Sequence, residues 1–183
     1  MISAIEGIVS LKEPTFVVLK TNGGVSYGLS VSLFCSARLE KGQKAELFTT
    51  HIVKEDSQRL FGFLDKGEQR MFELLLKVSG VGPSTAMAVC SSLDTNAFYA
   101  ALHTGDEAAL KRVAGIGVKS AKRIIVELGD AKVAIEGGDE AKNQALQALL
   151  SLGFKQDRVL KVLAECKAST TSELIKEALQ KLS

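Results

Sequence analysis

The chain has 183 residues, of which 46% are hydrophobic and 24% charged, and its net charge is +2. These values are ordinary for a globular protein, and they exclude a disordered chain, which would have few apolar residues and a high net charge. Three dispersed cysteines and two histidines argue against a disulfide framework and against a zinc site. No signal peptide and no apolar run of about 18 residues is visible, so we expect a cytoplasmic protein, and we predict no cofactor or metal.

The first third of the chain has the composition and alternation of short strands. A β-branched and aromatic run at 16–19 is followed by a turn signal at Asn22 to Gly24 and by a stretch of period-two alternation. The predicted strands cover residues 2–9, 16–19, 25–31, 45–53 and 60–63. We also predict a short helix over 32–39 with Ser32 as its N-cap. Five short strands in about 60 residues predict a small closed barrel of the oligonucleotide-binding (OB) type.

From residue 64 onward the apolar residues take helical spacing. A first apolar helix face comprises Met71, Phe72, Leu75, Leu76 and Val78. Asp94 is the predicted N-cap of a helix over 95–103, and Asp106 is the predicted N-cap of a shorter helix over 107–113.

The last part of the chain is separated by a stretch without periodicity, residues 130–138, which ends in Gly137-Gly138 and predicts a flexible linker. Three helices are predicted beyond it, from Asp139 to Gly153, over 156–166 and over 172–182, the last with Thr170 and Glu173 as a capping box. The predicted fold class is multidomain α+β. It comprises an OB-type barrel over 1–63, a helical domain over 64–129, the linker over 130–138 and a three-helix (UBA-like) module over 139–183.

An internal repeat is the strongest signal in the sequence. Residues 75–86 align with residues 110–121 at an offset of 35. Both copies predict a helix, a Gly-apolar-Gly turn and a second helix, with the glycines at Gly80 and Gly82 and at Gly115 and Gly117. Glycine permits a sharp turn and a close approach of ligand to backbone. The amides of the turn and of the following helix N-terminus would then offer a partial positive charge to a phosphate oxygen.

A Gly-x-Gly turn also occurs in other kinds of site and in ordinary helix corners. A Rossmann site is excluded because a helix precedes each turn and the third glycine is missing. A P-loop is excluded because Val118, not glycine, precedes Lys119. An ordinary corner between two helices explains one such turn as well as ligand binding does. The duplication favours phosphate binding.

Positive charge is concentrated beside the second turn. Residues 110–124 contain five basic residues and no acidic residue. Lys119, Lys122 and Arg123 recur at spacings of three and four, on one side of the helix that leaves the turn. A solvated basic face is the alternative interpretation. These residues lie next to the proposed amide site. They therefore predict binding to the sugar-phosphate backbone that is sensitive to salt and largely independent of sequence.

Four segments carry a resemblance to a known family. They are residues 50–56 with 60–63, Gly80-Val81-Gly82-Pro83, residues 115–117 with 123–127, and residues 148–154. In this order, and over essentially the whole chain, they resemble the RuvA family, the Holliday-junction-binding subunits of bacterial branch-migration complexes.

The resemblance implies a homotetramer, or two tetramers stacked as an octamer, that holds an open four-way junction on a basic surface. The implied phosphate-binding residues are Gly80, Gly82, Ser84, Gly115, Gly117, Lys119, Lys122 and Arg123. Ser84 departs from the family, which usually has lysine there, so we expect a weaker grip by the first turn. Glu55 and Asp56 match the family's acidic pin, although the residues alone indicate only a polar turn between strands.

The last module resembles the family's RuvB-binding domain. The implied contact residues are Leu149, Leu152, Phe154 and Leu179, and the alternative is that they form the core of the small bundle. The implied partner RuvB is the hexameric ATPase of the complex, which fits the absence of a Walker motif here, and the RuvC resolvase is a further implied partner.

Two rival functions were considered. A general duplex- or single-strand-binding protein would also suit an OB-type barrel and paired helical turns. A structure-specific nuclease would need a cluster of metal-binding carboxylates, whereas the acidic pairs, apart from the pin, are interpreted as helix caps or turn residues. The sequence therefore predicts a non-catalytic subunit that binds four-way junctions and recruits an ATPase.

Overall fold

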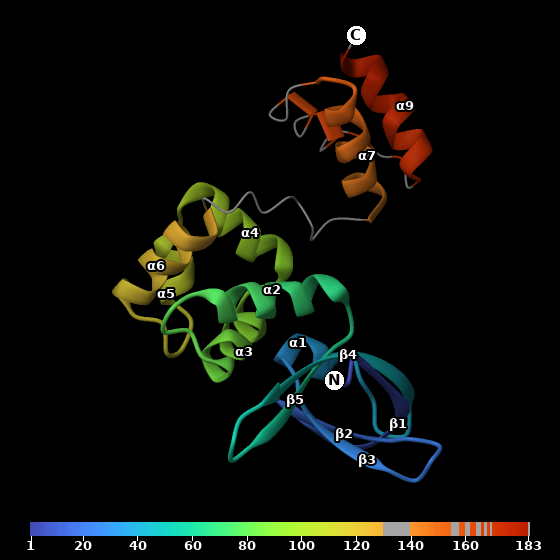
Figure 1. Cartoon of the computed structure of the whole chain (residues 1–183), viewed down its shortest axis with the longest axis vertical. Coiled ribbons are helices and arrows are strands. Elements are labelled where there is room, and N and C mark those ends of the chain that lie inside the picture. Colours follow the sequence, from blue (N-terminus) through green and yellow to red (C-terminus); the bar gives the residue numbers. More distant parts are fainter. Residues whose placement is uncertain are drawn as a thin grey trace. The chain divides into compact units, whose positions relative to one another are not determined.

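The computed structural model describes residues 1–129, 140–154, 158–159, 162–163, 166, 168 and 170–182. The chain divides into two compact units, Met1–Lys132 and Val133–Ser183 (Figure 1). The predicted linker and the predicted cap Asp139 lie outside the described residues, as does most of the helix predicted over 156–166. Within the part of the chain that is described, no helix is long and apolar enough to cross a membrane.

The N-terminal strands close into a barrel with the order β1-β2-β3-β5-β4. The strands are β1 (Ala4–Glu13), β2 (Phe16–Lys20), β3 (Ser26–Ser30), β4 (Lys44–Val53) and β5 (Gln58–Phe63). Neighbours pair antiparallel except for β3 and β5, which close the barrel in parallel through Ser30 and Phe61. The predicted OB-type barrel is confirmed.

Local sequence signals explain how the barrel is built. Strand β1 runs longer than predicted and ends where the turn at Pro14-Thr15 leads into β2. A register shift between Val9 and Leu11 marks a bulge in β1, which bends a strand as a small barrel requires. The short helix α1 (Leu33–Ala37) begins at its predicted cap, because the Ser32 hydroxyl accepts the Cys35 amide at 3.0 Å.

Five helices follow the barrel within the first unit. They are α2 (Lys66–Lys77), α3 (Pro83–Ser92), α4 (Thr95–Thr104), α5 (Glu107–Lys111) and α6 (Val118–Gly129). The carboxylates of Asp65, Asp94 and Asp106 accept backbone amides three residues ahead at 2.8, 2.7 and 3.0 Å, so the two predicted caps are confirmed. Helix α5 is shorter than predicted because the chain turns back after Arg112, where the Val113 amide bonds the Leu110 carbonyl.

The barrel and the helices share packing at their boundary. The rings of Phe61 and Phe63 on β5 lie 4.8 and 5.2 Å, centroid to centroid, from the ring of Phe72 on α2. All three rings are fully buried in the same cluster as the helices. In addition, the Leu33 amide of α1 donates to the Ser91 hydroxyl of α3 at 3.1 Å. The barrel and the five helices therefore form one compact body.

The C-terminal unit has its own apolar cluster. It is described by α7 (Glu140–Ser151), α9 (Thr171–Leu182) and a few residues between them. Helix α7 ends as predicted, with Gly153 at φ +89° and the Phe154 amide bonded to the Leu149 carbonyl at 3.3 Å. The predicted capping residues of α9 are paired, since the Thr170 hydroxyl donates to Glu173 Oε2 at 2.8 Å.

Candidate nucleic-acid interface

The sequence repeat is a structural repeat of two helix-hairpin-helix units, α2 with α3 and α5 with α6. Each turn is closed by the same bonds. The amides of Val81 and Ile116 donate to the carbonyls of Val78 and Val113 at 3.0 and 3.1 Å. Buried residues also correspond at the offset of 35, as in the pairs Leu75 and Leu110, Val78 and Val113, Val81 and Ile116, Ala86 and Ala121, and Val89 and Ile124. The predicted duplication therefore extends from sequence to backbone and core.

The first glycine of each turn has a backbone that other residues rarely adopt. Gly80 has φ +83° and Gly115 has φ +84°. An L-residue there would place its Cβ against the following carbonyl. Both glycines are exposed, and so are the residues that precede them, Ser79 and Ala114. Glycine thus permits the turn and leaves its backbone open to a ligand.

Each turn leads directly into a helix N-terminus. The first amides of a helix have no acceptor inside the helix and carry the positive end of its dipole. At α3, Gly82 caps without a side-chain bond and Pro83 occupies the first turn. At α6, the Ala121 amide bonds the Gly117 carbonyl, which corresponds to the bond between Ala86 and Gly82 in α3. Such ends suit an anion such as a phosphate oxygen.

The two hairpins differ in side-chain charge. All five basic residues between Leu110 and Ile124 are exposed. Lys119 stands at the position that corresponds to the exposed Ser84 in the first hairpin. From Ser79 to Ser92 the first hairpin has no basic residue at all. Its interaction with an anion would therefore depend on backbone amides.

Arg123 of α6 also contacts the first hairpin. Its Nη1 donates to the Ser79 carbonyl at 2.8 Å, and its Nε lies 3.9 Å from Glu127 Oε1. Glu127 Oε2 in turn accepts the Ser79 amide at 3.4 Å. The sequence predicts Arg123 only as a phosphate ligand and predicts no role for Glu127. Their spacing of four residues indicates a pair on one helix, but nothing local points to Ser79, 44 residues away.

Glu55 and Asp56 lie at the tip of the β4–β5 hairpin, which projects from the barrel (Figure 1). Both residues are exposed. The Lys54 amide donates to the Ser57 carbonyl at 2.8 Å and closes the turn around them. The structure thus presents two carboxylates on a short, closed loop.

The four apolar residues predicted to contact a partner in the C-terminal unit differ in exposure. Leu149 is fully buried in the cluster of that unit, and Phe154 and Leu179 are partly buried against it. Leu152 is 62% exposed, although it follows Leu149 by only three residues. Leu149 therefore belongs to the core of the unit, whereas Leu152 is exposed.

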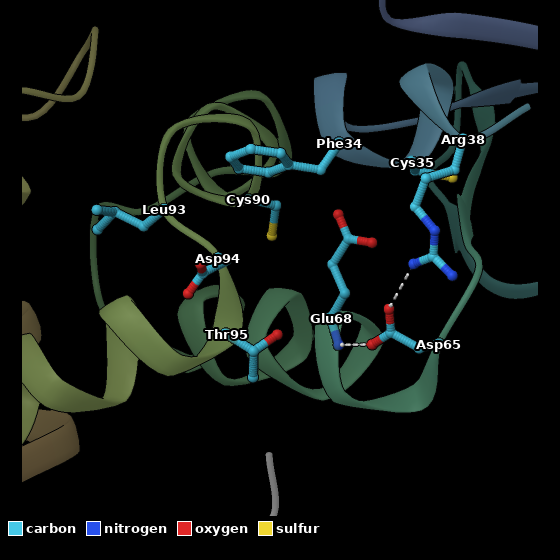
Figure 2. A pocket seen from close by; sticks show the side chains of 9 residues that line it. All are labelled: Phe34, Cys35, Arg38, Asp65, Glu68, Cys90, Leu93, Asp94 and Thr95. Carbon is cyan, nitrogen blue, oxygen red and sulfur yellow. Dashed lines mark hydrogen bonds and ion pairs between the residues drawn. The ribbon is translucent and has the colours of Figure 1, made fainter. Parts of the chain in front are cut away.

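A pocket of about 220 Å³ opens at the boundary of barrel and helices. Figure 2 shows the Glu68 side chain reaching into it between Cys35 and Cys90, with Arg38 and Asp65 paired at its side. Burial raises the pKa of Glu68 from 4.5 to about 7; a hydrogen bond from Ser32 and the charge of Arg38 oppose this, and Asp65 adds to it. Sequence reasoning assigned Glu68 to a helix cap or turn and did not foresee its burial.

The same pocket explains two of the cysteines. Burial raises the pKa of the Cys35 thiol to about 12 and raises that of Cys90 as well, so neither is a thiolate near neutral pH. Cys35, Cys90 and Cys166 are all buried, as small apolar residues are. Within the described residues, no group of three His, Cys, Asp or Glu residues is placed to hold a metal ion.

Comparison with known proteins gives this architecture a family. Residues 1–62 match the RuvA N terminal domain, residues 72–130 match the SAM-like helix-hairpin-helix tandem, and residues 140–183 match the RuvA, C-terminal domain. Proteins named Holliday junction branch migration complex subunit RuvA are similar over 100% of both chains. Those of Campylobacter lari, Campylobacter jejuni and Campylobacter curvus are 68%, 60% and 58% identical to it. With three domain matches in order and relatives of equal length, the chain belongs to the RuvA family.

Proposed function

We propose that the chain binds four-way junction DNA through its paired hairpins and serves as the DNA-binding subunit of a branch-migration complex. The observation that carries the proposal is the pair of equivalent hairpins, each with an open glycine turn at a helix N-terminus. The exposed basic residues beside the second hairpin support it. Full-length relatives named for the same complex support it independently.

The proposed contacts are to phosphate and not to bases. Gly80, Gly82, Gly115 and Gly117 bring backbone amides to the DNA, and Ser84 adds a hydroxyl. Lys119, Lys122 and Arg123 add positive charge. Amide and ammonium donors on a sugar-phosphate backbone position a protein without reading sequence. Binding is therefore expected to be indifferent to sequence and to weaken steeply with salt.

Junction shape is proposed to depend on assembly as a homotetramer, with each subunit holding one arm of an open junction. Glu55 and Asp56 of each subunit would then act as an acidic pin at the crossing point. Carboxylates repel phosphates, so a cluster of them keeps strands from closing on the centre. A second tetramer on the opposite face would complete an octamer.

The domain boundaries at 63/64, 129/130 and 138/139 are proposed to separate three tasks. The barrel and the hairpin domain hold the junction, the linker tethers the last module, and that module recruits RuvB. The ATPase of the complex is proposed to lie in RuvB, so this subunit is non-catalytic. The subunit is proposed to act in the cytoplasm. RuvC is a further proposed partner, which would cut the junction held open by this surface.

A competition gel shift tests the junction specificity of the whole chain. A labelled synthetic four-way junction is bound at fixed salt and is challenged with unlabelled junction or with linear duplex of the same length and sequence. We expect the junction to compete at far lower concentration than the duplex. Equal competition would show a general DNA-binding protein, and cleavage of the junction with magnesium would show a nuclease.

A further inference from the structure

We infer that Arg123 and Glu127 are positioning residues for the first hairpin, which hold its turn at a fixed place relative to the second hairpin. The inference rests on the proposed function, since it explains how two phosphate-binding turns keep one spacing. It begins with the backbone of Ser79. The Ser79 carbonyl accepts Arg123 Nη1 at 2.8 Å, and the Ser79 amide donates to Glu127 Oε2 at 3.4 Å.

Two side chains of α6 therefore hold both polar backbone groups of one residue in the opposite hairpin. Arg123 Nε lies 3.9 Å from Glu127 Oε1, so the two side chains also support each other. Ser79 immediately precedes Gly80, whose positive φ makes the sharp turn. A Cβ built on Gly80 would lie 3.4 Å from Arg123 Nη1, so the guanidinium lies against the turn itself.

Within the described residues, the second turn shows no counterpart to these two hydrogen bonds. Ala88 and Ser92 occupy the positions in α3 that correspond to Arg123 and Glu127 in α6. Alanine has no polar group to offer, and the Ser92 hydroxyl donates to the Ala88 carbonyl of its own helix at 2.8 Å. The second hairpin thus positions the first, and the duplicated fold alone does not require this arrangement.

The second hairpin holds the first, and this agrees with the difference in side-chain charge between the two hairpins. The first hairpin has no basic side chain from Ser79 to Ser92, so of its own groups only its amides and the Ser84 hydroxyl can hold a phosphate. A long cationic side chain can follow a phosphate that moves, whereas a backbone amide cannot. A fixed turn is therefore more important in the first hairpin, and the second supplies the side chains that fix it.

Paired substitutions of Glu127 separate positioning from charge. Glu127→Gln and Glu127→Ala remove the same negative charge, but only Gln keeps an oxygen that can accept the Ser79 amide. If only charge mattered, the two variants would bind a phosphate backbone with equal affinity. Both would bind it at least as tightly as the natural chain does. Positioning predicts that Glu127→Ala binds a synthetic four-way junction about five-fold more weakly than Glu127→Gln, as the loss of one hydrogen bond implies. Equal affinity of the two variants would overturn the inference.

A second measurement needs no DNA. Hydrogen exchange at the Ser79 amide of the free chain, followed by NMR, should be faster in Glu127→Ala than in Glu127→Gln, and an unchanged rate would also overturn the inference.

Val126→Ala, at an exposed position of α6, is the matched control for substitution on this helix. Arg123→Lys keeps the charge but loses the fork, so it should also weaken junction binding while leaving the salt dependence unchanged; full affinity would count against the inference. If the natural chain shows no preference for junctions, the proposed function fails, while the exchange data still test the contact.

Discussion

Glu68 shows how a single buried carboxyl makes the body of the protein sensitive to pH. Its side chain is 8% exposed, and Oε1 has no hydrogen-bond partner within the described structure. The charged form is costly there, which is why burial raises its pKa to about 7. In the unfolded chain the group returns to an ordinary carboxyl. Above pH 4.5 the folded state therefore holds a proton that the unfolded state has lost, and stability declines as the pH rises to about 7.

Glu68→Gln should remove this pH dependence. Between pH 5 and pH 8 the natural chain should lose roughly 2 to 3 kcal/mol of unfolding free energy more than the variant, because each pKa unit is worth about 1.4 kcal/mol. Urea unfolding at the two pH values measures the difference. Glu46→Gln, an exposed position on β4, is the matched control and should follow the natural chain. Parallel pH curves for Glu68→Gln and the natural chain would contradict the assignment.

The hairpin is the element on which the proposed function depends, and its two glycines have separable roles. Gly80 and Gly115 have positive φ, whereas Gly82 has φ −89°, which any residue adopts. A Cβ on Gly82 would meet nothing within 4 Å. The backbone conformation therefore requires glycine at Gly80 and Gly115. At Gly82 the conformation does not require glycine, and only the close approach of a ligand would.

Alanine substitution should distinguish the two positions. Gly80→Ala and Gly115→Ala should each cost about 1 to 2 kcal/mol of unfolding free energy, because an L-residue is strained at positive φ, and should weaken junction binding. Gly82→Ala should change stability by less than about 0.5 kcal/mol, because the smaller entropy of the unfolded chain offsets the poorer N-cap, and it should still weaken binding by narrowing the approach to the amides. Urea unfolding and junction titration give the two readouts. Unchanged affinity in all three variants would refute binding by the hairpin amides.

At the scale of the whole molecule, a net charge of +2 conceals an uneven distribution. Five exposed basic residues lie between Leu110 and Ile124, and acidic residues elsewhere, Glu55 and Asp56 among them, offset them. A protein that holds phosphates at the arms of a junction and repels them at its centre needs both signs. A nearly balanced total is therefore compatible with DNA binding, although a total alone suggests no nucleic-acid partner.

The C-terminal unit offers a prediction at this scale. Leu149→Ala should destabilise that unit by about 2 to 5 kcal/mol, because it leaves a cavity in a small core. Leu152→Ala should leave stability within about 0.5 kcal/mol of the natural chain but reduce the recruitment of RuvB to a bound junction. Thermal unfolding and co-sedimentation with RuvB test the pair. Full recruitment by Leu152→Ala would remove Leu152 from the proposed contact.

Much of this fold follows from local sequence. Ser32, Asp94 and Asp106 were predicted as caps and are caps, because a capping bond joins residues three apart. The duplicated hairpin was predicted because its glycines and apolar residues recur at one offset. The OB-type barrel followed from the number and spacing of short strands. For the caps and the hairpins, the interaction that forms the element lies within the segment that encodes it, whereas the barrel closes through distant pairs such as Ala4 with Phe48.

What the sequence by itself determined is therefore most of the described elements, their duplication and their family. Only the tertiary structure decided which surfaces meet: that Arg123 and Glu127 hold Ser79, that Glu68 is buried beside Cys35 and Cys90, and that Leu149 is core while Leu152 is exposed. The physical reason is distance along the chain. Periodicity within one segment predicts which face of a helix is buried, but it does not tell which residues tens of positions away that face meets.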